Sequence, residues 1–203
     1  IVNMGVISNG TTLLDAGAID SGIATGAMTL ISSITASNSN TIDFTSGITS
    51  TYKEYLFTFN NIHCNTNDQD FTFQTDTGTN TNYNITVTSA GFRPYHNEAG
   101  NSSGVGNLTG QDQAQGTGFQ QITQRLGSDN DQVASGHLRI YDPSNTTFVK
   151  HFVSRFSLYE AGDFAEDDFF AGYFNTTTAL TRFRFKMTSG GIGSGTIKLY
   201  GIK

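Results

Sequence analysis

Residues 180–189, LTRFRFKMTS, carry the clearest period in the chain. Apolar and basic side chains alternate through this stretch, with Phe183, Phe185 and Met187 set against Arg182, Arg184 and Lys186. A period of two is that of a β-strand with one buried face. We therefore expect the apolar set to face a core and the basic set to face outward.

Similar segments recur along the chain. In residues 51–63, TYKEYLFTFNNIH, the aromatic residues Tyr55, Phe57 and Phe59 share one face. About ten such strands follow one another at spacings typical of all-β domains, and no long helical pattern interrupts them. The prediction is an all-β fold, specifically an antiparallel β-sandwich of jelly-roll type with an extended N-terminal arm.

The segments between strands predict local connections. Residues 29–36 and 41–47 flank the turn SNSN, and residues 70–75 and 83–89 flank DTGTNTN, so each pair is expected to form a hairpin. Pro94 should confine the short strand at 91–95 to an edge or a bulge. Residues 97–118 are rich in Gly, Asn and Gln and predict a long functional or mobile loop.

The two ends of the chain differ. Residues 195–202, GTIKLYGI, alternate like a half-buried strand, so Ile197 and Leu199 should be buried and should close the sandwich. Residues 1–28 are punctuated by glycines and contain few large apolar residues. We interpret them as an arm that docks on another surface, the alternatives being a frayed terminus or an edge strand. A short helix over 13–19 is compatible with the sequence, although Gly17 weakens it.

This pattern divides the chain into a docking arm, 1–28, and a β-sandwich domain, 29–203. Met4 is a candidate start of the natural chain. Residues 1–10, IVNMGVISNG, lack the basic and apolar segments of a secretion signal, so we expect no signal peptide there.

Composition narrows the function further. The chain has 203 residues, 16 Phe, 8 Tyr and no Trp, and its charged residues are 14%, against about 25% in ordinary soluble domains. The net charge of −6 and the lack of a basic run argue against a nucleic-acid partner. No apolar stretch is long enough to predict a membrane span. The single cysteine, Cys64, allows no internal disulfide and is expected to be a buried structural thiol.

Motifs for catalysis are not evident in the sequence. The four histidines, His63, His96, His137 and His151, form no metal-binding motif, and solvent-facing or hydrogen-bonded roles are favoured for them. Neither a nucleophile elbow nor a phosphate-binding loop occurs. We therefore expect a protein without enzymatic activity and assign no catalytic, cofactor-binding or metal-binding residue.

One acidic cluster leaves three interpretations open. It consists of Glu160, Asp163, Glu166, Asp167 and Asp168. A solvated acidic turn is favoured, a structural calcium site comes second because carboxylate oxygens suit Ca²⁺, and a catalytic carboxylate pair comes last. Residues 65–70 and 129–131 allow the same calcium hypothesis, but neither has the glycine and late glutamate of an EF-hand.

Several long phrases resemble a group of small structural proteins of marine tailed bacteriophages, including phages of cyanobacteria. They lie at 9–33, 41–63, 92–98, 114–120, 142–156 and 195–202 and occur in the same order. The resemblance implies a virion protein, either a capsid decoration protein or a tail or fibre component. It implies no catalytic or binding residues.

Together these observations predict a non-enzymatic structural protein of the phage virion, made in the host cytoplasm. The arm would attach it to major capsid or tail proteins, and the sandwich would form a homo-oligomer, with a trimer expected before other symmetries. The alternative is a glycan-binding receptor module of a tail fibre, with aromatic and amide side chains converging on a loop cluster such as 97–118.

Overall fold

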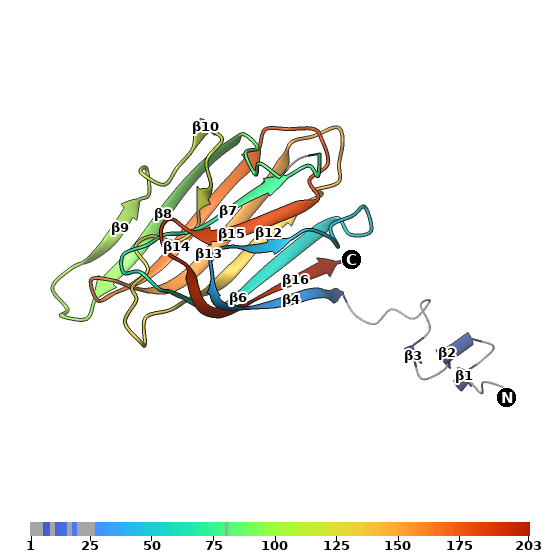
Figure 1. Ribbon diagram of the computed structural model, residues 1–203, viewed down its shortest axis with the longest axis horizontal. Helices are drawn as coiled ribbons and strands as arrows, with labels where there is room; N and C mark the ends of the chain where they lie inside the picture. Colours follow the sequence, from blue (N-terminus) through green and yellow to red (C-terminus); the bar gives the residue numbers. More distant parts are fainter. Residues whose placement is uncertain (1–5, 9–10, 16–17, 20–26, 80) are drawn as a thin grey trace.

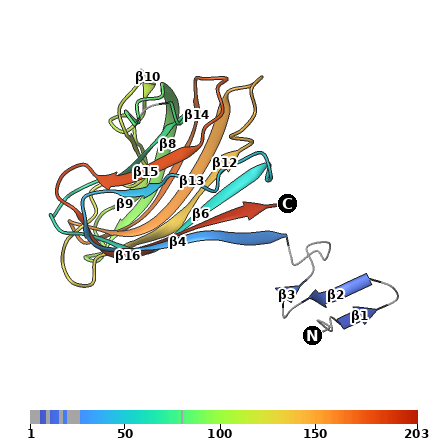
Figure 2. The ribbon, with the colours of Figure 1, turned by 45° about the vertical axis from the view of Figure 1, so that its right-hand side comes forward.

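The computed structural model describes residues 6–8, 11–15, 18–19, 27–79 and 81–203. This part of the chain is 58% strand without any helix, and its sheets are antiparallel, which confirms the all-β prediction. It accordingly contains no helix that could cross a membrane. Two large sheets pack face to face, and a third, smaller sheet lies near the N-terminus (Figures 1 and 2).

The larger sheet of the sandwich has nine strands. In spatial order they are β10 (Ala114–Gly116), β8 (Val87–Asn97), β14 (Phe164–Phe174), β13 (Lys150–Glu160), β12 (Ala134–Tyr141), β6 (Glu54–Cys64), β16 (Ile192–Ile202) and β4 (Met28–Ser39), and β9 (Ser103–Asn107) also pairs with β8. The sheet therefore ends in β4 at one edge and in β9 and β10 at the other.

The second sheet of the sandwich has four strands and covers the inner face of the nine-stranded sheet. Their order is β11 (Gln120–Gln121), β7 (Phe71–Asp76), β15 (Arg182–Met187) and β5 (Ile42–Phe44). The ring of Phe185 on β15 lies 5.1 Å from that of Phe57 and 5.2 Å from that of Phe59, both on β6. Such edge-to-face contacts add to the free energy gained by burying the rings.

Two predictions about buried faces are confirmed. Phe183, Phe185 and Met187 are buried between the sheets, as the alternation in 180–189 predicts. Ile197 and Leu199 are also fully buried, on the strand β16 that lies between β6 and β4. The C-terminal strand is therefore an integral part of the core.

Both predicted hairpins are wrong. β4 belongs to the nine-stranded sheet and β5 to the four-stranded sheet, so the chain crosses between layers at 40–41. β7 and β8 are likewise in different sheets. A turn sequence between two strand patterns predicts a change of direction, but it does not decide whether the second strand pairs with the first.

The predictions for 91–118 need correction as well. β8 is a long strand with partners on both sides, although its ladder to β14 skips Arg93 and Pro94 before it resumes in the same register. Pro94 lies at this gap in the ladder to β14, a position that suits a residue without an N–H. The segment 97–118 contains β9 and β10, which both pair with β8, so much of it is sheet edge.

The described N-terminal residues form strands. β1 (Val6–Ser8), β2 (Thr11–Asp15) and β3 (Ala18–Ile19) make an antiparallel sheet of their own. The helix considered for 13–19 is therefore wrong where the structure describes those residues. The rest of the predicted arm, at 1–5, 9–10, 16–17 and 20–26, lies outside the described residues, and the jelly-roll connectivity and the boundary at residue 28 stay predictions.

Candidate functional site

The outer faces of the two sheets differ in what covers them. On the four-stranded sheet, the Gln74 side-chain amide donates hydrogen bonds of 3.0 and 2.9 Å to the carbonyl oxygens of Ile85 and Gly118. Lys186 lies over the ring of Phe119, with its Nζ 4.4 Å from the ring centroid. Loops therefore pack onto this face. The outer face of the nine-stranded sheet instead presents exposed side chains, and we take it as the candidate functional surface.

The centre of this surface is apolar and aromatic. Phe92 on β8 is 46% exposed, and its ring stacks on that of Phe169 on β14 with centroids 4.9 Å apart. Val153 of the neighbouring strand β13 is also exposed. The Arg155 guanidinium lies 4.9 Å from the centroid of Phe169 and pairs with Asp167. The arginine therefore covers one aromatic ring while its charge is neutralised.

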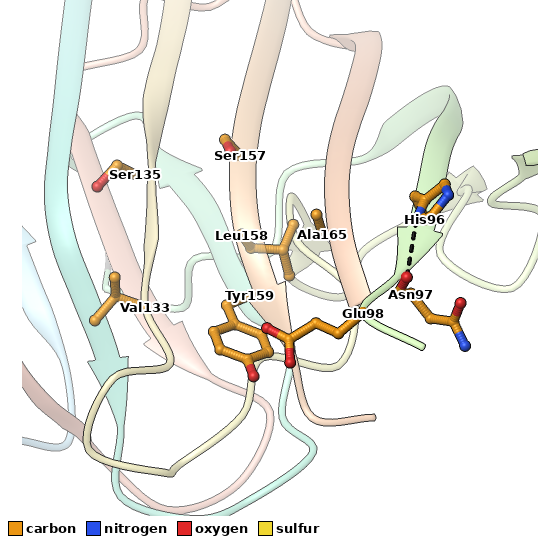
Figure 3. Close-up of a pocket in the computed structure, with 9 residues that line it drawn as sticks. All are labelled: His96, Asn97, Glu98, Val133, Ser135, Ser157, Leu158, Tyr159 and Ala165. Carbon is orange, nitrogen blue, oxygen red and sulfur yellow. Dashed lines mark hydrogen bonds between the residues drawn. The ribbon is translucent and has the colours of Figure 1, made fainter. Parts of the chain in front are cut away.

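A pocket of about 510 Å³ lies at one end of the outer face (Figure 3). Nine residues from β8, β12, β13, β14 and adjoining loops line it: His96, Asn97, Glu98, Val133, Ser135, Ser157, Leu158, Tyr159 and Ala165. Figure 3 shows the side chains of Tyr159 and Glu98 beside each other. The volume falls within the usual range for small-molecule sites.

Tyr159 gives this pocket its chemical character. Its hydroxyl donates a hydrogen bond of 3.2 Å to the Asp163 carboxylate. Desolvation, together with hydrogen bonding to the carboxylates of Glu98 and Asp163, raises the pKa of Tyr159 to about 12. The phenol is therefore neutral at physiological pH. The pocket combines an aromatic ring, one carboxylate, an amide and serine hydroxyls, a set that suits a neutral ligand rich in hydroxyl groups.

A second hollow, of about 640 Å³, lies at the opposite end of β12 and β13. Phe148, which is 68% exposed, lines it together with Tyr141, Asp142, Asn145 and His151. Its lining is thus aromatic, with an amide and a carboxylate. The outer face therefore has a polar-aromatic hollow at each end of its apolar centre.

The predicted acidic turn is wrong for three of its five residues. Glu160 ends β13, and Glu166 and Asp168 lie on β14. All three are buried between the sheets. Asp163 and Asp167 remain accessible and bind Tyr159 and Arg155, respectively.

Two arginines partly neutralise the buried carboxylates. Arg93 forms an ion pair with Glu166, and the Arg125 guanidinium lies 2.8 Å from Glu160. Asp168 accepts a hydrogen bond of 2.7 Å from the main-chain N–H of Gln124, while its Oδ1 has no hydrogen-bond partner within the described part of the chain. Burial, reinforced by the charge of Glu166, raises the pKa of Asp168 to about 8.

The histidines do not come together in one site. His63 and His96 contact main-chain carbonyl oxygens, at 3.2 and 2.8 Å. His137 and His151 lie on the outer face of β12 and β13. Burial and the charges of nearby arginines lower the pKa of His137. Among the residues that the structure describes, no three His, Cys, Asp or Glu side chains are grouped to hold a metal ion. The calcium hypothesis stays a prediction.

Cys64 is buried, as predicted. Its thiol lies 3.1 Å from the carbonyl oxygen of Gly127, to which it donates a hydrogen bond. Burial raises the pKa of this thiol to about 11. It is therefore a structural group in the core.

Sequence reasoning missed the outer aromatic pair and a buried cation. Phe92 and Phe169 belong to different sheet strands that are far apart in the sequence, so no local pattern joins them. Lys150 is fully buried, and its Nζ donates hydrogen bonds to the carbonyl oxygens of Phe148 and Thr176. Lys150 is two residues from Phe152, and both occupy the inward face of β13, so the burial of Lys150 could have been predicted from the strand period.

Comparison of the chain with family models, with curated proteins and with solved structures gave no match.

Proposed function

We propose that this chain is a non-enzymatic structural protein of a tailed-phage virion, attached through residues 1–28 to capsid or tail proteins. The observation that supports the proposal most is the separate N-terminal sheet. β1, β2 and β3 pair with one another and with neither sheet of the sandwich. A segment that is strand-forming but outside the domain core is suited to docking on a neighbouring protein.

The outer face of the nine-stranded sheet supports the same proposal. Contiguous exposed apolar groups commonly mark protein–protein interfaces. Phe92, Phe169 and Val153 form such a group on β8, β14 and β13. A protein that assembles on a particle needs surfaces of this kind. The copy number per particle distinguishes a position on the head surface from one at a collar or in a small fibre.

Deletion of residues 1–26 tests the attachment. The truncated chain should keep the melting temperature and the strand-rich circular dichroism spectrum of the full chain, because β4 begins after the deletion. It should fail to bind to particles that lack the protein, while the full chain binds. Equal binding of the truncated and full chains would contradict attachment through this segment.

A glycan-binding module of a tail fibre is the second candidate, and the pocket around Tyr159 favours it. Aromatic rings stack on sugar rings, and carboxylates and hydroxyls accept or donate hydrogen bonds to sugar hydroxyls. Asn97, an amide of the kind expected in 97–118, lines this pocket together with Glu98 and Tyr159.

A glycan array with the full chain tests this candidate. Binding should be lost in Tyr159→Ala and retained in Tyr173→Ala, a tyrosine on the outer face of β14 that does not line this pocket. No binding to any glycan, or equal losses in both variants, would exclude the pocket as a sugar site.

A further inference from the structure

The edges of the sandwich differ in length. The four-stranded sheet ends in β5 and β11, with three and two residues. The nine-stranded sheet ends in β9 and β10, with five and three residues, at one side, and in β4, with twelve, at the other. Short edge strands leave few main-chain groups for a partner to pair with. Among the described strands of the sandwich, β4 thus offers by far the longest free edge (Figures 1 and 2).

β4 also differs from the other strands in charge. Its sequence, MTLISSITASNS, contains no Asp, Glu, Lys or Arg. Every other described strand of six or more residues contains at least one of them, as β6, β7, β8, β12, β13, β14, β15 and β16 show. Natural sheets commonly protect an exposed edge with lysine, proline or a bulge. β4 has no lysine or proline, and its bulge at Ile31 leaves 32–37 in regular register with β16.

Large apolar side chains lie at one end of this edge. Met28 is 49% exposed and Leu30 is 53% exposed. Across the sheet they are opposite Ile202 and Tyr200 of β16. A further strand alongside β4 would contact these side chains and remove apolar surface from water. Asn38 has a φ of 53°, so the edge available for pairing is 28–37, with one bulge at Ile31, where the register to β16 shifts by one residue.

We infer that β4 pairs antiparallel with β4 of a second copy of this chain, which joins two nine-stranded sheets into one across a two-fold axis. The free N–H and C=O groups of an edge strand are satisfied by another strand. In a two-fold contact each strand faces its own sequence, so any charge near the axis meets a like charge. A long edge strand without charges meets this requirement. A different protein would be better selected by complementary charges, which β4 does not provide.

This inference concerns the sandwich and does not depend on a role in a virion. A two-fold contact between single chains produces a dimer. If the chain forms the expected trimer, the same contact joins two trimers. The partner is a second copy of the chain, and the contact is made by main-chain hydrogen bonds along 28–37 with Met28 and Leu30 at the seam.

Two matched variants of the full chain test the contact. Ser33 and Thr58 both lie opposite Lys198, on either side of β16, but only Ser33 is on the free edge. Ser33→Glu and Thr58→Glu therefore add the same charge next to the same lysine. Because Ser33 lies near the middle of 28–37, Ser33→Glu also sets two carboxylates near each other across the proposed axis.

Sedimentation equilibrium over a concentration series measures the effect. We expect the full chain to dimerise, Ser33→Glu to raise the dimer Kd at least about tenfold, and Thr58→Glu to leave it within about twofold. Both variants should keep the melting temperature of the unsubstituted chain. A full chain that stays monomeric at its solubility limit, or a Ser33→Glu variant that associates as tightly as Thr58→Glu, would overturn the inference.

Cysteine cross-linking gives the direction of pairing. Under mild oxidation, single cysteines placed at Leu30, Ser33, Thr35 and Ser37 should cross-link most strongly at one position and less on either side, because antiparallel strands bring only residues near the axis together. Cys64 is buried and should not interfere. Equal cross-linking at all four positions, or none at any of them, would contradict a two-fold β4 contact.

Discussion

The rings of Phe92 and Phe169 lie parallel across β8 and β14, with centroids 4.9 Å apart and an angle of 1° between their planes. They stack on the outside of the sandwich, whereas the rings of Phe57, Phe59 and Phe185 meet inside it. The protein therefore has two aromatic clusters in different surroundings. The inner one stabilises the fold, and the outer one is available to a partner.

Alanine substitutions in the two clusters should differ in cost. Phe185→Ala removes a fully buried ring and is expected to lower the free energy of unfolding by about 3 to 5 kcal/mol. Phe92→Ala removes a half-exposed ring and should cost about 1 kcal/mol, close to the value of a surface aromatic pair. Urea denaturation measures both. A cost for Phe92→Ala as large as that for Phe185→Ala would show that the outer cluster belongs to the core.

The buried carboxylate of Asp168 predicts how stability depends on pH. Burial raises its pKa from 3.8 to about 8 in the folded chain. Between these values the folded state holds a proton that the unfolded state has lost, so this group makes the protein less stable as the pH rises from about 4 to 8. Asp168→Asn should remove that contribution, because the amide stays neutral and its oxygen can still accept the hydrogen bond from the Gln124 N–H.

Melting temperatures of both chains between pH 4 and 9 test this prediction. Asp168→Asn should gain most at pH 8 to 9 and show a flatter profile. Asp167→Asn is the matched control, since the neighbouring side chain faces outward and pairs with Arg155. If Asp168→Asn were less stable than the unsubstituted chain at pH 9, the buried carboxylate would have a charged partner that the proposed account omits.

Cys64 should be unreactive until the protein unfolds. Its thiol is buried, and burial raises its pKa to about 11, so at pH 8 almost none is present as the reactive thiolate. A thiol reagent such as Ellman's should react with the native chain only slowly and with one equivalent at once in denaturant. Rapid reaction under native conditions would show that the sheet end near Gly127 opens readily.

The strands themselves could be predicted from the sequence. The alternation at 182–187 and 195–202 identified buried faces correctly, because a side chain's face in a strand depends only on its own position. Pairing could not be predicted in the same way. β4 and β5 follow each other across a turn sequence, but the chain crosses to the other sheet there, and the choice depends on contacts far along the chain.

The acidic cluster shows a second kind of limit. Glu166 and Asp168 are an even number of residues from the buried Phe170 and Phe174, so their inward direction could have been found from the same alternation. What the sequence did not reveal is the partner of Glu166, because Arg93 reaches it from a strand more than seventy residues away. Without that partner a solvated turn was the natural interpretation.

The copy number of this chain in purified phage particles tests the central claim most directly. Quantitative mass spectrometry against the major capsid protein should find a fixed number of copies per particle, in the hundreds for a head-surface protein or a few for a tail component. Absence of the chain from purified particles of a phage whose genome encodes it would contradict the proposal that it is a structural protein of the virion.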